Sequence, residues 1–235
     1  MTTPMPAPAF APAPPGAFLR SPVGLGRATA VLLGLVIATD LFAVWADLQE
    51  AGVAGDLADG VTGAGVVDRA DHADHLYGIA GILQGVVLVA TAVVFLCWLW
   101  RARTNAEVFD PAGQSRARGW AIGGWFCPVV NLWFPRRIVL DVWDASAPWG
   151  SRVRHGLVNS WWALWLLSLF AGRAASTMYR RADSAAQLRD ATRQMAFADA
   201  VDIVAAVLAV LVVCRLTAMQ HRKALAGLAP VPAFG

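Results

Sequence analysis

Long apolar stretches, separated by shorter polar ones, dominate the pattern of the 235-residue chain. Four of these stretches, at about 27–47, 77–100, 156–173 and 199–219, contain few charged residues. About twenty apolar residues are enough for an α-helix to cross the ~30 Å hydrocarbon core of a membrane. The pattern therefore predicts an all-α integral membrane fold with four transmembrane helices.

A fifth apolar run, Gly119–Pro135, lies between the second and third predicted spans. It is shorter than the others, and Pro128 would kink or end a helix because it lacks a backbone donor. From Ile138 to Trp149, apolar and acidic residues alternate with a helical period, which is typical of a helix lying in the membrane interface. We therefore expect 119–149 to be a re-entrant or interfacial segment, with a fifth span as the alternative.

The distribution of basic residues predicts the orientation. With four spans, 13 of the 19 lysines and arginines lie on the side of the two termini and six on the other side. A fifth span would change this split to 11 and eight. Because basic residues are enriched in cytoplasmic loops, four spans are favoured, with the helices in a plasma membrane and both termini in the cytoplasm.

The two predicted outer segments differ in charge. Residues 47–75 carry seven acids and one base, Arg69, as expected outside the cytoplasm. Residues 173–199 carry five arginines, which fits that side less well. Ser184 followed by Gln187 is a capping-box pattern, which predicts that a helix begins there and keeps these arginines in water.

The ends of the chain differ from the apolar body in composition. Residues 1–18 are uncharged and rich in proline and alanine, and we expect a disordered tail there. Residues 19–224 form one multi-pass membrane domain, followed by a flexible tail at 225–235. A cleaved signal peptide is the competing interpretation, but the apolar run at 28–46 exceeds the ~7–15 residues usual in such peptides.

Composition also supports a membrane protein. Hydrophobic residues make up 57% and charged residues 15% of the chain, whereas soluble domains carry about 25% charged residues. The net charge of +3 is scattered, without the basic stripe of a nucleic-acid-binding protein, so no nucleic acid is expected as a partner. Cys97, Cys127 and Cys214 lie in or beside apolar runs, and no disulfide framework is implied.

Small residues recur at four-residue spacing in two of the predicted spans. Ala30, Gly34 and Ala38 do so in the first, and Gly81 and Gly85 in the second. Such stripes allow helices to approach closely in lipid. We expect them at helix contacts, although the high frequency of alanine and glycine is an alternative explanation.

Two distinctive motifs lie at the end of the second span and after it. One, W-x-x-R-x-x-x-N, runs from Trp98 to Asn105, and the other, G-W…P-x-x-N-x-W-x-P, runs from Gly119 to Pro135. With these motifs, the chain from about Leu25 to Lys223 resembles a family of bacterial, chiefly actinobacterial, membrane proteins grouped as domain of unknown function 4328. The resemblance implies a multi-pass membrane protein, and it implies no activity, substrate or binding residue.

The densest polar group precedes the second span. Asp68, Asp71, His72 and His75 would share one face of a helix, and such residues can bind a divalent metal. The alternative is that they form the solvated N-terminal turns of the helix, where negative charge is favourable. We favour the alternative, and expect no metal and no other cofactor.

Asp40 and Asp202 are carboxylates within predicted spans. Such groups are costly in a membrane and often functional, as in proton or cation pathways. Both fall toward the predicted outer ends of their helices, where water or an arginine from 173–199 could satisfy them. We favour structural pairing over a role in transport.

Basic and amide side chains are frequent on the predicted inner face. They could form a collar that binds anionic lipid headgroups, with ordinary anchoring by positive charge as the alternative. The collar residues are Arg101, Arg103, Asn105, Asn131, Arg136 and Arg137, with further arginines at 116, 118, 152 and 154.

Enzyme motifs are missing from the sequence: it has no Walker loop, G-x-S-x-G, H-E-x-x-H or C-x-x-C. The favoured hypothesis is a non-enzymatic protein that acts by packing, by binding other membrane proteins, or by binding lipid headgroups. The second hypothesis is a small transporter or channel using Asp40 and Asp202. The third is a membrane-embedded enzyme acting on a phosphate-bearing lipid.

Overall fold

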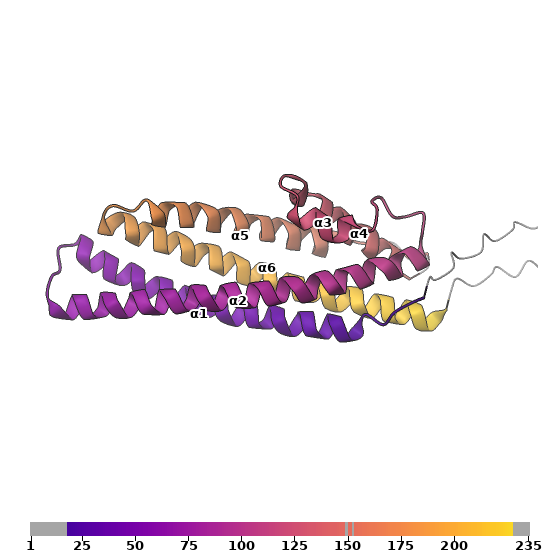
Figure 1. Ribbon diagram of the computed structural model, residues 1–235, viewed down its shortest axis with the longest axis horizontal. Coiled ribbons are helices and arrows are strands. Elements are labelled where there is room, and N and C mark those ends of the chain that lie inside the picture. Colours follow the sequence, from indigo (N-terminus) through magenta and orange to yellow (C-terminus); the bar gives the residue numbers. More distant parts are fainter. Residues whose placement is uncertain (1–17, 149, 152, 228–235) are drawn as a thin grey trace, which may run out of the picture.

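The structure is a computed structural model and describes residues 18–148, 150–151 and 153–227. Every secondary-structure element in these residues is helical. The four long helices are α1 (Val23–Ala58), α2 (Ala64–Phe109), α5 (Gly156–Arg180) and α6 (Ala185–Ala226). Three short elements join α2 to α5, namely α3 (Trp120–Phe126), the 3-10 helix η1 (Val130–Leu132) and α4 (Phe134–Ser146) (Figure 1).

The long helices run side by side. α1 packs against both α2 and α6, and α6 packs against α5. The turns at 59–63 and 181–184 lie at one end of the bundle, here named the loop end (Figure 1). Residues 18–22, the end of α6, α3 and α4 lie at the opposite end, here named the terminal end. Both described ends of the chain are therefore on the same side of the bundle.

Three of the described helices could cross a membrane by length and composition, namely α1, α2 and α6. The fourth predicted span, 156–173, lies within α5, which has 25 residues and is about 37 Å long. It is not among the three, because Asn159, Arg173 and three tryptophans lower the mean hydropathy of its apolar run. The expected all-α, membrane-spanning character is present in the described residues.

The helices extend well beyond a membrane core. α2 has 46 residues and is about 69 Å long, more than twice the ~30 Å of hydrocarbon. Most of 47–75 is therefore helical, because α1 continues to Ala58 and α2 begins at Ala64. At the other turn, Ser184 Oγ accepts a hydrogen bond from the Gln187 N–H at 3.3 Å, which confirms the predicted helix start.

The segment after α2 is broken, as Pro128 indicated. α3 ends at Phe126, the chain is extended at Cys127, and Val129 has a positive φ of 68°. With seven residues, α3 is only about 10 Å long and cannot cross a membrane.

α4 is a helix, as expected in this region, and it is packed into the apolar core of the bundle. Ile138, Val139 and Val142 are each at most 1% exposed, and they belong to the main apolar core with Trp98 and Leu216. The helix packs against α2, α5 and α6 and so has partners on several sides. Alternation of apolar and acidic residues does not give α4 a solvated face at position 141. Asp141 is buried and accepts a hydrogen bond from the Ser115 N–H.

α1 and α6 approach closely at Gly26, where a Cβ atom would collide with the Thr217 side chain of α6. Gly34, Gly81 and Gly85 face open space. The expected helix contacts through these three glycines are therefore wrong. The faces that α1 and α2 turn toward their neighbours are different ones, and the small residues recur outside them because they are frequent throughout the chain.

Candidate functional site

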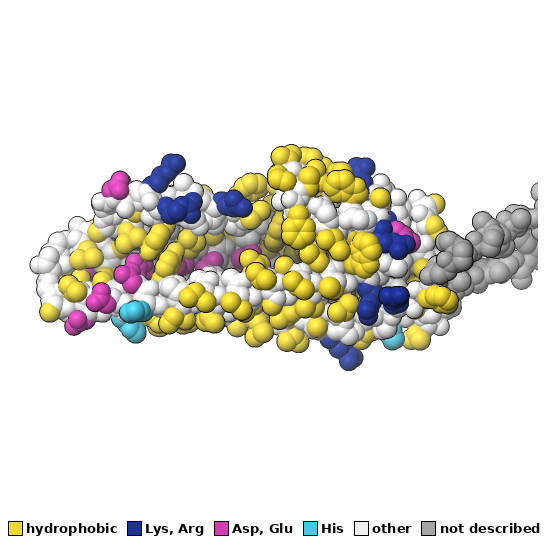
Figure 2. All heavy atoms as spheres, in the orientation of Figure 1, with side chains coloured by type: hydrophobic (Ala, Val, Ile, Leu, Met, Phe, Trp, Pro, Cys, Tyr) yellow, Lys and Arg dark blue, Asp and Glu magenta, His cyan; other side chains and the backbone are white. Residues whose placement is uncertain are grey.

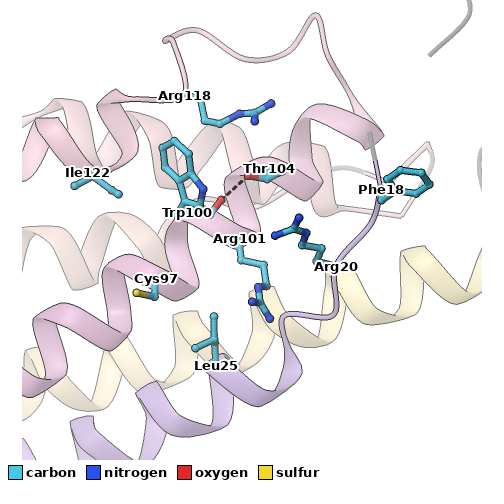
Figure 3. Close-up of a pocket in the computed structure, with 9 residues that line it drawn as sticks. All are labelled: Phe18, Arg20, Leu25, Cys97, Trp100, Arg101, Thr104, Arg118 and Ile122. Atoms are coloured by element: carbon cyan, nitrogen blue, oxygen red, sulfur yellow. Dashed lines mark hydrogen bonds between the residues drawn. The ribbon is translucent and has the colours of Figure 1, made fainter. Parts of the chain in front are cut away.

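A pocket of about 550 Å³ opens at the terminal end of the bundle. It lies between the stretch before α1, the second half of α2, and the segment around the start of α3 (Figure 3). Three of its residues are arginines and none is acidic, so the lining is suited to an anion. The lining residues are Phe18, Arg20, Leu25, Cys97, Trp100, Arg101, Thr104, Arg118 and Ile122.

Asn105 of α2 fixes the chain before α1. Its side chain accepts a hydrogen bond from the Arg20 N–H at 3.0 Å and donates one to the Arg20 C=O at 2.8 Å. It also donates to Gln220 Oε1 at 3.1 Å, and Gln220 donates to the Ala102 C=O at 2.8 Å. Asn105 is 2% exposed, so this buried network determines where the Arg20 side chain begins.

The rest of the W-x-x-R-x-x-x-N motif acts in the same region. Trp98 donates from Nε1 to Thr217 Oγ1 of α6 at 3.0 Å. Arg101 donates from Nη1 to the Ser21 C=O at 3.2 Å and lines the pocket. The motif therefore joins α2 to α6 and to the chain before α1, and it places Arg101 at the opening (Figure 3).

Glu107 positions Arg118 at the edge of the pocket. Arg118 donates two hydrogen bonds to Glu107 Oε2, the one from Nε at 2.8 Å, and these bonds raise the pKa of Arg118. Arg103 donates from Nη1 to Glu107 Oε1 at 2.7 Å and from Nη2 to the Arg116 C=O at 2.7 Å. Two guanidinium groups thus share one carboxylate, and net positive charge remains at this edge.

The predicted collar is divided in the structure. Arg101, Arg103 and Asn105 lie within about one turn of α2 near the pocket. Only Arg101 lines it, whereas Arg103 and Asn105 are buried anchors, each 2% exposed.

The other three collar residues lie outside the pocket lining. Arg136 donates two hydrogen bonds to Asn159 Oδ1, at 3.1 and 2.8 Å. Arg137 pairs with Asp141 at 3.2 Å, and Asn131 is half-buried in η1. Arg136 therefore joins α4 to α5, whereas the Arg137–Asp141 pair lies within α4.

The collar predicted from the sequence lacked Arg20, and sequence reasoning did not single out Phe18 or Trp100 for this site. Arg20 comes 85 positions before Asn105, and only the folded chain brings the two together. The available signal was that Arg20 is the first charged residue after the uncharged N-terminal stretch.

The second motif, in 119–135, contributes an aromatic cluster beside the pocket. The Trp125 ring packs edge-on against Phe95, Trp162 and Trp165, at centroid distances of 5.4, 5.8 and 5.6 Å. Trp162 Nε1 donates to the Leu132 C=O at 2.9 Å. These contacts bind the broken segment to α2 and α5, so the motif has a structural explanation.

Asp40 and Asp202, on α1 and α6, face each other within hydrogen-bonding range. Gln84 Nε2 donates to Asp40 Oδ1 at 3.0 Å, and Ser168 Oγ donates to Asp202 Oδ1 at 2.7 Å. Asp40 is 4% exposed and Asp202 is half-buried. Each carboxyl group thus has a neutral hydrogen-bond donor and another carboxyl group as neighbours. The sequence had suggested water or an arginine from 173–199 as the partner.

Further buried acids continue from this pair toward the loop end. Asp47 and Glu50 on α1 are 2% and 4% exposed, and Asp199 on α6 is half-buried. Sequence reasoning counted Asp47 and Glu50 with a solvated outer loop. Their spacing from Asp40 was the available signal, because positions 40, 47 and 50 share one helix face. Figure 2 shows acidic side chains in a hollow between α2 and α5.

The candidate metal ligands Asp68, Asp71, His72 and His75 are all exposed on α2. Within the described ranges, no three His, Cys, Asp or Glu side chains come together in a way that could hold a metal ion.

The fold and the pocket define an all-helical protein of the membrane-spanning type, with a basic pocket at the terminal end. The chain belongs to the family described as a domain of unknown function (DUF4328), whose model matches residues 62–218. The match runs from the start of α2 into α6 and leaves out α1, which the resemblance had been expected to include. Neither a curated protein nor a solved structure matches the chain.

Proposed function

We propose that this protein binds phosphate-bearing lipid headgroups of the cytoplasmic leaflet in the pocket lined by Arg20, Arg101 and Arg118. It acts by binding and catalyses no reaction. The observation that carries the proposal is that three arginines, from three separate segments, surround one opening whose other walls are mainly apolar.

The proposal includes a placement in the bacterial plasma membrane with four crossings. α5 would be the fourth crossing, because it packs along α6 and joins the two ends of the bundle. The terminal end would be cytoplasmic, with 119–149 beside the inner leaflet, because most basic residues then lie on the cytoplasmic side.

The chemistry of the lining matches a headgroup with its glycerol and acyl base. Guanidinium groups bind phosphate with two parallel hydrogen bonds. Trp100, 38% exposed, lies where the apolar part of α2 ends, as expected of tryptophan at a membrane interface. Leu25, Cys97 and Ile122 add apolar wall on which acyl chains can rest.

The test compares two lipids on the purified full chain in detergent. Native mass spectrometry should show more phosphatidylglycerol than phosphatidylcholine bound per protein. In the double variant Arg20→Gln, Arg101→Gln this preference should fall several-fold. A matched control is Arg173→Gln, Arg181→Gln, which removes two exposed arginines from the other half of the bundle and should keep the preference.

Two results would overturn the proposal. One is equal binding of both lipids by the unaltered protein. The other is an equal loss of preference in the control, which would mean that net charge alone attracts the lipid. Displacement of phosphatidylglycerol by inorganic phosphate at similar concentration would assign the pocket to a free anion instead of a lipid.

A further inference from the structure

Carboxyl groups face each other in pairs along the half of the bundle nearer the loop end. Each pair joins one acid of α1 to one acid of a neighbouring helix, within hydrogen-bonding range. From the middle of the bundle outward, the pairs are Asp40 with Asp202, Asp47 with Asp199, and Glu50 with Asp74. Asp74 is exposed, so the series begins at the aqueous surface of the loop end.

No basic side chain of the described residues forms an ion pair with the inner two pairs. Among the described residues, the ion pairs include none of Asp40, Asp47, Asp199 and Asp202. The groups that face these pairs are neutral or acidic on every helix. They are Asp40, Asp47 and Glu50 on α1, Tyr77 and Gln84 on α2, Ser168 and Tyr179 on α5, and Asp199 and Asp202 on α6.

Two oxygens in this series have unused acceptor capacity. Asp40 Oδ2 and Asp47 Oδ2 are buried and accept no hydrogen bond from any described residue. The two residues are 96% and 98% buried. An ionised carboxylate in such surroundings is strongly destabilising unless a positive charge or a proton accompanies it.

The hollow between α2 and α5 gives this series an opening (Figure 2). The backbones of α2 and α5 do not pack closely against each other. Aromatic side chains connect the two helices at two places along their length. Tyr77 stacks on Tyr179 at 5.0 Å, and Phe95 meets Trp161 at 6.2 Å. On each helix the two aromatic contacts are 18 residues, or about 27 Å, apart. Gln84 of α2 and Ser168 of α5 lie between these contacts.

We propose that the facing carboxyl groups of Asp40 and Asp202 bind a monovalent cation, which exchanges with a single proton shared by the pair. The cation enters as the O–H bond breaks and the proton leaves to water, so the charge of the site stays the same. Gln84 and Ser168 supply further oxygen atoms. A divalent ion fits less well, because it prefers six or more oxygen ligands and no three acids of the described chain converge.

The other two pairs lead from this site to the loop end. Each pair tends to hold one proton or one cation, because two adjacent ionised carboxylates repel each other. The inference is independent of the lipid pocket, which lies at the opposite end and shares no residue with it.

Proton release provides the test. Purified full chain in weakly buffered detergent solution, above neutral pH, receives sodium chloride or, for comparison, choline chloride at the same ionic strength. Sodium should release about one proton per cation bound and raise the thermal unfolding temperature, whereas choline should do neither. Below neutral pH the effect on unfolding should shrink, because protons then occupy the site.

The variant Asp40→Asn, Asp202→Asn should still fold, since the amides resemble protonated carboxyl groups, and its proton release should disappear. The matched control Asp68→Asn, Asp71→Asn changes two exposed acids of α2 and should keep it.

Three outcomes would overturn the proposal: no release with sodium, lithium or potassium; equal release from the Asp40→Asn, Asp202→Asn variant; or release with calcium alone. If that variant fails to fold, release by the unaltered protein and its reduction in Ser168→Ala decide the question.

Discussion

Asn105 pairs with both backbone polar groups of Arg20, at 3.0 and 2.8 Å, although 85 positions separate the two residues. The pairing is like that between two β-strands, with an amide side chain in place of one backbone. It holds the chain before α1 against α2, and it thereby forms one wall of the basic pocket.

Replacing Asn105 with leucine should destabilise the fold. Leucine removes the partner that Asn105 gives to the Arg20 N–H, the Arg20 C=O and Gln220 Oε1, and a buried unsatisfied group costs about 1–3 kcal/mol. We expect a loss of about 3 kcal/mol in the free energy of unfolding, measured with denaturant in detergent. Thr104→Val is the control, because Thr104 bonds only a carbonyl of its own helix. Equal losses in both variants would contradict the role given to Asn105.

Replacing Glu107 with glutamine should also be costly. It leaves the guanidinium of Arg103, whose side chain is 3% exposed, without a carboxylate partner. Removing one member of a buried ion pair costs about 3–5 kcal/mol, and the partial exposure of Glu107 reduces this to about 2 kcal/mol.

The same chemical change at an exposed pair is the control for Glu107→Gln. Asp144 and His155 have side chains 47% and 39% exposed, and Asp144→Asn should cost less than about 1 kcal/mol. Glu107→Gln also releases Arg118 from its carboxylate partner. The preference of the variant protein for phosphatidylglycerol over phosphatidylcholine should therefore rise. An unchanged stability would mean that Arg116 alone satisfies Arg103.

Gly26 should tolerate no large side chain. Leucine there would be driven into Thr217 of α6 and should cost at least about 1–3 kcal/mol, the usual cost of overpacking. Gly34→Leu makes the same change two turns further along α1, where a side chain meets open space, and it should be close to neutral. Thermal unfolding of both variants in detergent distinguishes them. A similar loss of stability in Gly34→Leu would mean that another helix or a second copy of the chain packs against that face of α1.

The four-crossing placement can be tested with single cysteines. In a Cys-free background, cysteines at Ser115 and Ser151 should both react with a membrane-impermeant thiol reagent from the cytoplasmic side. The two positions are exposed and flank the segment of α3 and α4. Labelling of one of them only from outside would mean that this segment crosses the membrane.

Local features of the fold were predictable from the sequence. Pro128 ends α3, and Ser184 caps α6, because both act within one or two turns of the backbone. Length and apolar composition likewise identify α1, α2 and α6 as membrane-type helices. Predictions about helix contacts were less successful, since small residues at Gly34 and Gly81 allow a close approach without requiring one.

The sequence by itself determined that this is an all-helical membrane-type chain with a broken segment after α2, because hydrophobic length, proline and capping are local properties. Only the tertiary structure decided which side chains meet. Arg20 joins Arg101 and Arg118, and Asp40 faces Asp202, through packing between helices that lie far apart in the chain. Helical periodicity assigns a residue to a face, but the neighbour on that face depends on how all the helices pack together.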